Sequence, residues 1–438
     1  MHFGIQNIIF IVVLIAAFAL FGRSFSKIWR NIKLGRDKNR SDRPSERWAL
    51  MTRVAFGQSK MVKRRAVAGF FHVVIYAGFL LINIEVAEIL IDGIFGTHRL
   101  FAEPLGGLYD VAINFFEILA VLVIIACLVF LYRRNVSVVP RFKDLTGWAK
   151  KDGNNILIIE LVLMTALLLL GAVEANLPDA KAGPWLVSGM LAPIFSGFSV
   201  ESLHIMERVF WWAHILGILA FLNYLPYSKH FHIILAFPNV WYSKLEPKGQ
   251  FTNMESVKKE VELMMDPNAD PFAAPPEGAE AAAPERFGAK DVMDLDWVQL
   301  MNSYACTECG RCTDSCPANI TGKKLSPRKI MMDTRDRLEE VGKNIDANNG
   351  EFKEDGKTLI DDYISREELW ACTTCNACTV ACPVNIDPLS IIMDMRRYLV
   401  MEESAANQAL NGMMSNVENN GAPWAYPAAD RGNWINEA

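Results

Sequence analysis

Charged side chains are scarce in five stretches of this 438-residue sequence. Each stretch has close to the roughly 20 apolar residues that a helix needs to cross a bilayer. A hydrophobic content of 51% and a positive mean hydropathy are also high for a soluble protein. The first stretch lacks the basic n-region and the cleavage site of a signal peptide, so we expect it to be retained as a helix. The predicted transmembrane helices are residues 5–22, 66–91, 109–132, 155–175 and 205–227.

Basic residues are scarce in two of the connecting loops. Residues 92–108 and 176–203 contain one Lys or Arg each, whereas residues 23–65 and 133–151 are densely basic. Membrane proteins concentrate Lys and Arg in their cytoplasmic loops, so this asymmetry favours transmembrane helices over the buried helices of a large soluble protein. We expect a protein of the bacterial inner membrane with its N-terminus outside and everything after about residue 228 in the cytoplasm. Because these charges set orientation, no nucleic-acid binding is expected.

Cysteine is almost confined to one part of the sequence. Eight of the nine cysteines form two identical Cys-x-x-Cys-x-x-Cys-x-x-x-Cys-Pro runs, which begin at Cys306 and Cys372. Two-residue gaps curl three thiolates around one face of a [4Fe-4S] cube, and in two-cluster proteins the fourth cysteine of each run binds the other cluster. Zinc sites usually use pairs of Cys-x-x-Cys, so zinc ribbons and disulfides are disfavoured.

This spacing predicts two [4Fe-4S] clusters with crossed ligand sets. The first set is Cys306, Cys309, Cys312 and Cys382. The second set is Cys372, Cys375, Cys378 and Cys316. A cytoplasmic position suits both sets, because a reducing compartment keeps thiolates free for iron. The ninth cysteine, Cys127, lies in an apolar stretch, where we expect a buried and inert thiol.

Histidine provides candidate ligands in the membrane half. His72 lies inside the second predicted span, His214 inside the fifth, and His230 and His232 at the cytoplasmic end of the fifth. A histidine in hydrocarbon is costly and usually functional, and pairs on facing helices bind b-type haem in membrane bundles. A hydrogen bond between helices is the alternative role. By depth alone, His72 pairs with either His232 or His214.

Composition and patterning together predict an all-α protein. We expect a five-helix transmembrane bundle that binds haem b, followed by a cytoplasmic α-helical ferredoxin-like domain with two [4Fe-4S] clusters. In the second domain the apolar spacing predicts helices at residues 294–305, 328–341 and 388–401, and an acidic insertion at residues 342–358. The predicted parts are residues 1–235 (membrane domain), 236–286 (cytoplasmic connector with a Pro-, Ala- and Glu-rich tether that begins at 264 and runs to 290), 287–404 (dicluster domain) and 405–438 (irregular tail, disordered or docking a partner).

The end of the membrane half resembles a known family. The string from His214 through Pro226 to His232 is similar to the last helix of the nitrate reductase gamma family, five-span dihaem cytochromes b, in which one His precedes the Pro by twelve residues and another follows it by six. His72, in Gly69-Phe-Phe-His72, matches the first of two histidines in that family's second helix, whereas the second falls at Ile82. The resemblance implies one haem on His72 and His232. A second haem would use His214 without a matching partner, with His230 as a spare ligand.

The cysteine-rich half resembles the heterodisulfide reductase-related iron-sulfur proteins, which include membrane oxidoreductases that connect electron-transferring flavoprotein to menaquinone. The segment from Glu418 to Trp424 resembles the one that, in fused members, leads into Cys-Cys-Gly domains, and no such domain follows here. The resemblance implies a separate partner subunit, with Cys-Cys-Gly domains or a flavoprotein. The motifs that carry it are Tyr304-Ala-Cys306-Thr-Glu-Cys309-Gly-Arg-Cys312, Ser326-Pro327, Ala371-Cys372-Thr-Thr-Cys375 and Asp394-Met-Arg-Arg-Tyr-Leu-Val-Met-Glu402.

Carboxylates inside the predicted spans are candidates for proton transfer. Glu85 and Glu88 lie one helical turn apart in the outer part of the second span, and such groups are costly in lipid. We expect one of them to relay a proton to a quinone or to organise haem propionates, with Glu117 and Glu160 as further candidates. Structural pairing with Lys or Arg is the alternative.

These observations predict an oxidoreductase subunit. Electrons would pass from a cytoplasmic partner through the two clusters and haem b to menaquinone, as the family resemblance favours. Cluster potentials span a wide range, so oxidation of quinol with electrons leaving through the clusters is one alternative. A non-catalytic membrane anchor or redox sensor is another, and it would have no use for His72 and His232 as haem ligands.

Overall fold

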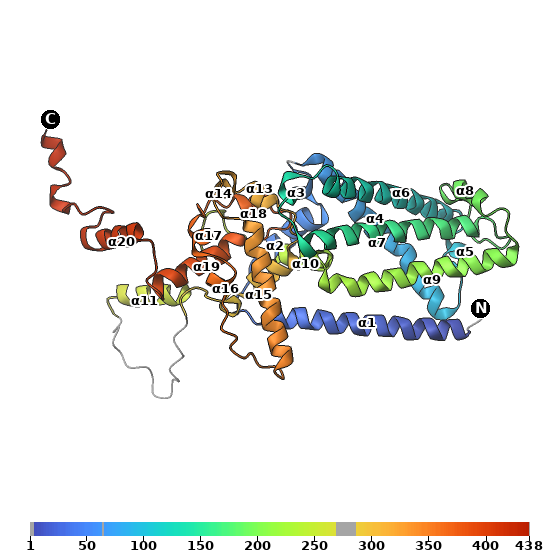
Figure 1. Cartoon of the computed structure of the whole chain (residues 1–438), viewed down its shortest axis with the longest axis horizontal. Coiled ribbons are helices and arrows are strands. Elements are labelled where there is room, and N and C mark those ends of the chain that lie inside the picture. Colours follow the sequence, from blue (N-terminus) through green and yellow to red (C-terminus); the bar gives the residue numbers. More distant parts are fainter. Residues whose placement is uncertain (1–3, 64, 269–285, 438) are drawn as a thin grey trace.

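The computed structural model describes residues 4–63, 65–268 and 286–437. Within these ranges the chain forms helices joined by loops, with isolated β-bridges and no β-strand (Figure 1). The predicted all-α class is confirmed. Most of the tether predicted for residues 264–290 lies outside the described residues.

Within the described ranges, five helices are long and apolar enough to cross a membrane, which confirms the predicted number. They pack in a closed ring in the order α1, α4, α6, α7, α9 and back to α1. The C-terminal ends of α1, α6 and α9 and the N-terminal ends of α4 and α7 lie at the same end of the bundle, next to the cysteine-rich domain (Figure 1). The five are α1 (Ile5–Ile32), α4 (Ala66–Phe95), α6 (Gly107–Asn135), α7 (Gly147–Glu174) and α9 (Val200–Tyr224).

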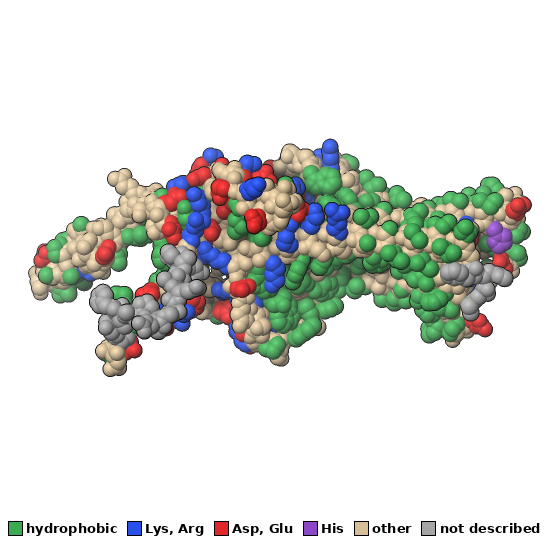
Figure 2. All heavy atoms as spheres, turned by 90° about the horizontal axis from the view of Figure 1, so that it is seen from below, with side chains coloured by type: hydrophobic (Ala, Val, Ile, Leu, Met, Phe, Trp, Pro, Cys, Tyr) green, Lys and Arg blue, Asp and Glu red, His purple; other side chains and the backbone are tan. Residues whose placement is uncertain are grey.

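The outer surface of this ring is apolar. Large side chains such as Val12, Ile15 and Val162 are more than half exposed. Figure 2 shows hydrophobic side chains covering the bundle, with Lys and Arg gathered where it adjoins the cysteine-rich domain. Exposed apolar area costs about 25 cal/mol per Å² in water, so this surface suits lipid acyl chains.

Helix α1 continues to Ile32, well beyond the predicted end of the first span at residue 22. Its last turns pack on the cysteine-rich domain, where Asn31 Nδ2 donates to the Tyr304 hydroxyl at 3.0 Å. Lys27 and Arg30 both form ion pairs with Asp346. A hydropathy criterion stops where charges begin, whereas the helix continues because Lys and Arg are good helix formers.

The cysteine-rich domain consists of helices α12 to α19. Asp296 caps α12, accepting from the Gln299 backbone N–H at 2.9 Å, so this helix begins at Trp297 rather than at the predicted residue 294. Helix α15 continues to Ala347 because residues up to Ile345 extend its buried face, so the expected insertion at 342–358 is helical in its first turns. The helices are α12 (Trp297–Ala305), α13 (Arg311–Asp314), α14 (Pro317–Ile320), α15 (Pro327–Ala347), α16 (Leu359–Asp362), α17 (Arg366–Trp370), α18 (Ala377–Ala381) and α19 (Pro388–Met401).

Shorter elements complete the chain. The tail, expected to be irregular, contains α20, which is capped by Gly421 in the left-handed conformation. The other α-helices are α2 (Pro44–Met51), α3 (Ser59–Val62), α5 (Ala102–Leu105), α8 (Ser188–Leu191), α10 (His232–Trp241), α11 (Glu255–Met265) and α20 (Gln408–Asn420). A π-helical turn spans Thr52–Phe56, and 3-10 turns span Pro140–Phe142, Ala192–Ile194, Leu225–Tyr227, Lys229–Phe231, Val292–Asp294, Ala428–Asp430 and Asn433–Asn436.

Gly288 provides a test of the close packing between the start of the cysteine-rich domain and helix α19. It has φ 71°, and a Cβ there would lie 2.2 Å from the backbone oxygen of Asp394. We expect Gly288→Ala to destabilise the domain by about 1–3 kcal/mol or more, measured as a lower Tm. Gly356→Ala is the matched control, because Gly356 also has φ 71° but a Cβ there would meet no atom within 4 Å. Equal losses of Tm in both variants would contradict this packing.

Candidate functional site

The end of the helix bundle that adjoins the cysteine-rich domain (Figure 1) is called the inner end here, and together with that domain it encloses a shared cavity of about 340 Å³. This volume lies within the range of small-molecule and cofactor sites. Helices α4, α6, α7 and α10 line one side, and both cysteine runs line the other. The predicted ligands that reach it are Cys306, Cys309, Cys312, Cys382, His72, His230 and His232.

His72 and His232 lie close together at this cavity. Their ring centroids are 6.4 Å apart. The Nδ1 of His232 lies 3.1 Å from the Lys229 carbonyl oxygen, so we assign its proton to Nδ1 and its lone pair to Nε2. The Nδ1 of His72 is buried without a hydrogen-bond partner in the described part of the chain. Of the two partners that depth allowed, the structure brings His232 to His72.

A broken helix puts His232 in this position. Helix α9 ends at Tyr224, Pro226 lies in a 3-10 turn, and His232 begins the new helix α10. Depth alone left His232 and His214 open as partners, and the turn favours His232 because it brings this residue back to the cavity that His72 also lines. Asp152 of α7 fixes the turn by accepting hydrogen bonds from the Tyr224 hydroxyl at 2.6 Å, the Ser228 hydroxyl at 2.7 Å and the Lys229 backbone N–H at 3.0 Å. Sequence reasoning missed Asp152, because it stands next to Lys150 and Lys151, outside the predicted span 155–175, where an acidic residue is not unusual.

His230 is a third imidazole beside this pair. Its ring stacks on Phe221 with centroids 5.2 Å apart and lies 5.4 Å from the ring of His232. Its Nε2 is buried without a hydrogen-bond partner among the described residues. Burial lowers the pKa of both His230 and His232, so both are neutral at pH 7, which is the form that binds metals.

His214 does not line this cavity. Its buried Nδ1 lies 3.0 Å from the Leu163 carbonyl oxygen, the interhelical hydrogen bond that was the alternative role for these histidines. Ile82, which stands where the resembled family has its second histidine, is buried in the hydrophobic core. The structure therefore separates His214 from the other three histidines.

The two cysteine runs have matching backbone conformations. Glu308 and Thr374, each two residues after the first cysteine, have φ 55° and 58°. Gly310 and Asn376, two residues further on, have φ 72° and 58°. These left-handed residues curl each run, and Gly and Asn adopt this conformation more readily than most residues.

The cysteines fall into two groups in space. Cys382 of the second run joins three cysteines of the first run on the cavity wall, whereas the other four do not line the cavity. Cys372 has Cys316 and Cys375 as electrostatic neighbours. Cys375 is exposed to solvent. The crossed ligand sets stay a prediction, with which this grouping agrees in part, since Cys312 also has Cys378 among its electrostatic neighbours.

Glu308 links the first cysteine run to the turn below α9. Its carboxylate accepts from Lys229 Nζ and from Arg335 Nη2, both at 2.7 Å. Burial alone would raise the pKa of Glu308, but the two cations outweigh it and hold that pKa below its usual value. Because the Lys229 carbonyl also contacts His232, one residue connects the imidazole to the cysteine loop.

Arginine side chains line the same cavity. Arg141 Nε donates to the Cys309 carbonyl oxygen at 2.9 Å, and Arg328 donates to the Arg141 carbonyl oxygen at 2.6 Å. The Nη1 of Arg141 is buried without a hydrogen-bond partner among the described residues. The basic residues on the wall are Arg133, Arg134, Arg141, Lys229, Arg311 and Arg328, so the cavity is suited to an anionic group.

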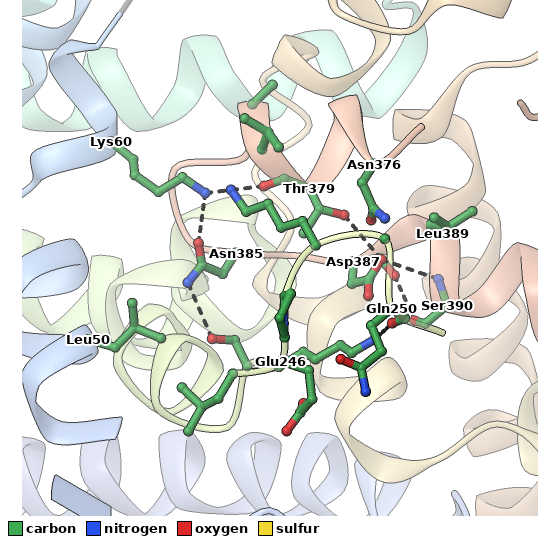
Figure 3. Close-up of a pocket in the computed structure, with 18 of the residues that line it drawn as sticks. Leu50, Lys60, Glu246, Gln250, Asn376, Thr379, Asn385, Asp387, Leu389 and Ser390 are labelled. Atoms are coloured by element: carbon green, nitrogen blue, oxygen red, sulfur yellow. Dashed lines mark hydrogen bonds between the residues drawn. The ribbon is translucent and has the colours of Figure 1, made fainter. Parts of the chain in front are cut away.

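A second groove of about 920 Å³ lies beside α18, outside the shared cavity. Figure 3 shows Lys60 reaching across it toward Asn385 and Thr379. Lys60 Nζ donates to Asn385 Oδ1 at 2.7 Å and to the Thr379 carbonyl oxygen at 3.2 Å. Burial lowers the pKa of Lys60 to about 8. These bonds join the segment before α4 to the second cysteine run.

The predicted proton-transfer carboxylates occupy three different places. Glu85 and Glu88 lie at the opposite end of the bundle, where Arg99 Nη1 is 3.5 Å from Glu85 and the Tyr109 hydroxyl donates to Glu88 at 2.6 Å. Arg99 comes from the loop after α4, so the structure shows for Glu85 the pairing with a basic residue that was the alternative role. Glu117 accepts from backbone N–H groups of residues 187 and 188. Only Glu160, among these four, lines the shared cavity.

Comparison with known proteins supports an iron-sulfur assignment. Residues 305–386 match the 4Fe-4S dicluster domain family. The chain is 30% identical over 463 residues to the "Probable iron-sulfur-binding oxidoreductase FadF" of Bacillus subtilis, covering 98% of this chain and 61% of that protein. It is 26% identical to the "EtfAB:quinone oxidoreductase" of Syntrophomonas wolfei, covering 91% of this chain and 55% of that protein. A "Probable membrane-anchored ferredoxin" of Chromohalobacter salexigens is 32% identical over 35% of this chain and 25% of its own length. No solved structure matches.

These relatives show what the chain is similar to. It has a 4Fe-4S domain and, in its described part, five helices long and apolar enough to cross a membrane, and it is related to iron-sulfur oxidoreductases that include EtfAB:quinone oxidoreductase. It spans about 60% of the length of the FadF relative and 55% of the length of the EtfAB:quinone oxidoreductase. The remaining 39% and 45% of those two proteins have no counterpart in the aligned part of this chain.

Glu308 gives a pH-dependent prediction. Because its pKa is lowered in the folded chain, its ion pairs stabilise the protein above the usual carboxyl pKa, and this contribution is lost as the pH falls through the folded pKa. We expect Glu308→Gln to cost about 1.5–3 kcal/mol at pH 7, measured as a lower Tm. The Tm difference from wild type should stay constant down to about pH 5 and shrink below about pH 4.5.

Glu367→Gln is the matched control, because Glu367 pairs with Lys324 at 2.7 Å and both side chains are more than half exposed. Its Tm should change little, as is usual for surface ion pairs. A Tm loss in Glu308→Gln that persists unchanged at acid pH would contradict the proposed link.

Proposed function

We propose that this chain is the electron-transferring subunit of a quinone-linked oxidoreductase in the bacterial inner membrane. It passes electrons from a cytoplasmic redox partner to menaquinone, with two [4Fe-4S] clusters and haem b as its carriers. The observation that carries the proposal is the single cavity onto which four cysteines and the His72 and His232 pair both open. Such an arrangement brings two kinds of redox ligand to the inner end of the membrane bundle.

The residues of the cavity fit haem b. His72 and His232 supply two neighbouring imidazoles, and the Lys229 carbonyl holds His232 with its Nε2 directed away from the backbone. The two carboxylates of a haem need cationic partners. Arg141 can be such a partner, because its buried Nη1 has no hydrogen-bond acceptor among the described residues. Haem bound by these residues supplies a one-electron carrier. We assign one haem to this pair, since His214 lies away from the cavity.

The cysteine groups fit two cubane clusters. The set of Cys306, Cys309, Cys312 and Cys382 opens onto the haem cavity. The set of Cys372, Cys375, Cys378 and Cys316 includes an exposed thiol at Cys375, so a partner protein can approach it from the cytoplasm. We infer that the second set receives electrons from the partner and that the first set passes them toward the membrane.

Glu160 is placed to handle the proton that quinone reduction consumes. It lies on α7 within a membrane-spanning helix and lines the shared cavity. Among the described residues, no hydrogen bond or ion pair reaches its carboxylate, which is costly in a bilayer unless the cavity supplies a partner. We therefore favour Glu160 over Glu85 and Glu88, whose partners lie at the other end of the bundle. A proton role for Glu85 or Glu88 stays a prediction.

The partner that delivers electrons is a further part of this proposal. One relative is called EtfAB:quinone oxidoreductase, which favours an electron-transferring flavoprotein or a subunit with Cys-Cys-Gly domains as the partner. The densely basic segments lie at the same end of the bundle as the cysteine-rich domain, which favours a cytoplasmic position for that domain (Figure 2). With this orientation the N-terminus lies outside.

The haem assignment is tested by replacing the histidines. We expect His72→Ala and His232→Ala to lose the haem b bands from the reduced-minus-oxidised spectrum while retaining their iron-sulfur clusters. His204→Ala is the matched control, since His204 is exposed on the outer part of α9. Unchanged haem content in both His72→Ala and His232→Ala would rule out the pair as ligands.

The crossed cysteine sets are tested by serine variants. Each variant should alter the EPR signal of one cluster. We expect Cys382→Ser and Cys309→Ser to alter the same signal, and Cys375→Ser to alter the other one. Each variant should lower the iron content from about eight toward about four atoms per chain, because one cube loses a ligand. If Cys382→Ser altered the same signal as Cys375→Ser, each run would bind its own cluster and the crossed sets would be wrong.

A further inference from the structure

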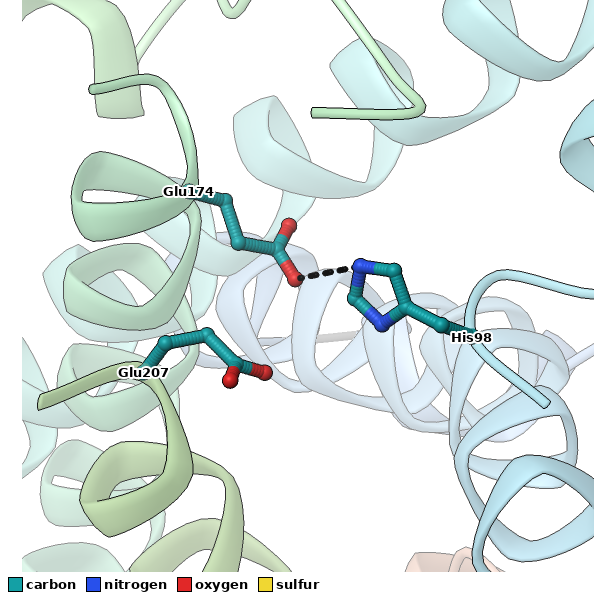
Figure 4. Close-up of side chains that lie close together, drawn as sticks. All are labelled: His98, Glu174 and Glu207. Carbon is teal, nitrogen blue, oxygen red and sulfur yellow. Dashed lines mark ion pairs between the residues drawn. The ribbon is translucent and has the colours of Figure 1, made fainter. Parts of the chain in front are cut away.

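A second group of ligand-type side chains lies at the end of the bundle opposite the cysteine-rich domain. Figure 4 shows His98 and Glu174 facing each other with Glu207 beside them. One ligand atom from each of the three lies within 4.8 Å of the other two. His98 comes from the loop after α4, Glu174 is the last residue of α7, and Glu207 lies in α9. Three separate elements therefore converge here.

Glu174 has one carboxylate oxygen in use and one that points to this group. Its Oε2 accepts from Arg99 at 2.5 Å and 2.9 Å. Its Oε1 lies 3.9 Å from His98 Nε2, which is too far for a hydrogen bond. The Glu174 side chain is only 6% exposed. Among the described residues, no hydrogen bond reaches Oε1, so this oxygen is open to a further ligand or to water.

The surrounding side chains also carry more carboxylates than basic groups, which favours a bound cation. Five buried carboxylates lie in this part of the bundle, and two of them, Glu88 and Asp92, accept hydrogen bonds only from neutral hydroxyl and backbone N–H donors. The cations that pair with the other three are Arg99 and Arg208. Lys181 adds an ammonium group that donates to the His98 carbonyl oxygen at 3.0 Å, so the group has two more acids than basic side chains. The five carboxylates are Glu85, Glu88, Asp92, Glu174 and Glu207.

We propose that His98, Glu174 and Glu207 bind one divalent transition-metal cation of the Zn²⁺ type. One imidazole and two carboxylates match the ligands that Zn²⁺ takes in proteins, with water completing the tetrahedron. Bonds of about 2.0–2.1 Å put tetrahedral ligand atoms about 3.3 Å apart, so the three side chains must close in slightly on binding. His98 has room to do so, because its side chain is 37% exposed and sits on a loop.

The cation would join three elements that otherwise meet through long side chains. The Glu207 carboxylate pairs with the neighbouring Arg208. Because the Arg208 side chain is 44% exposed, it can move toward solvent and leave one Glu207 oxygen free for the metal. The loop at His98 would be fastened to the ends of α7 and α9. The site is a structural one, independent of the electron path, and its ligands lie outside the shared cavity.

The test is Zn²⁺ binding by the intact protein in detergent. The purified chain is dialysed against EDTA, loaded with Zn²⁺, desalted, and assayed for zinc and iron by mass spectrometry. We expect one additional Zn²⁺ per chain with unchanged iron, which distinguishes this site from vacated cysteine ligands. His98→Ala should abolish retention or weaken the Kd by about tenfold or more.

His204→Ala is the matched control, because His204 lies on the same helix as Glu207 and is exposed. It should bind Zn²⁺ as wild type does. Glu207→Gln, which keeps the side-chain shape, should weaken binding as His98→Ala does, so the proposal does not depend on one variant folding. Wild-type protein that retains no zinc, or His98→Ala and Glu207→Gln proteins that retain it as His204→Ala does, would overturn the site.

Discussion

The arrangement of the candidate redox site depends on one buried carboxylate. Asp152, which is 1% exposed, accepts hydrogen bonds from the Tyr224 and Ser228 hydroxyls and from the Lys229 backbone N–H. These bonds hold the chain just after Pro226 ends the last membrane helix. Without the turn, α9 would carry His232 away from the bundle and from His72. A buried carboxylate satisfied by three donors is a strong local constraint, because losing it would leave several polar groups unpaired.

Lys229 then connects that turn to the cysteine-rich domain. Its backbone contacts Asp152 and His232, and its ammonium group contacts Glu308 between two of the candidate cluster ligands. The extension of α1 to Ile32 and the bonds of Lys60 hold the same two domains together at other points. Several independent contacts thus fix the cysteine loops against the inner end of the bundle. Electron transfer between sites needs such a fixed short separation.

Much of this architecture could be predicted from the sequence. Hydropathy predicted five spans because a bilayer demands long apolar helices, and cysteine spacing predicted a 4Fe-4S domain because the geometry of a cube restricts the gaps. The break at Pro226 and its clamp Asp152 could not be found by periodicity, since they depend on contacts between residues far apart in the chain. Arg99 was missed as the partner of Glu85 for the same reason. The longer ends of α1 and α15 reflect packing on another domain, which local propensity does not contain.

The central claim is that a cluster and a haem share one cavity at the inner end of the bundle. EPR relaxation of the reduced clusters, recorded with the haem oxidised, tests it most directly, because a paramagnetic ferric haem speeds the relaxation of a nearby cluster. We predict faster relaxation and a broadened signal for one of two clusters in the wild-type protein, and loss of both effects in His72→Ala. Two clusters that relax identically with and without haem would contradict the account.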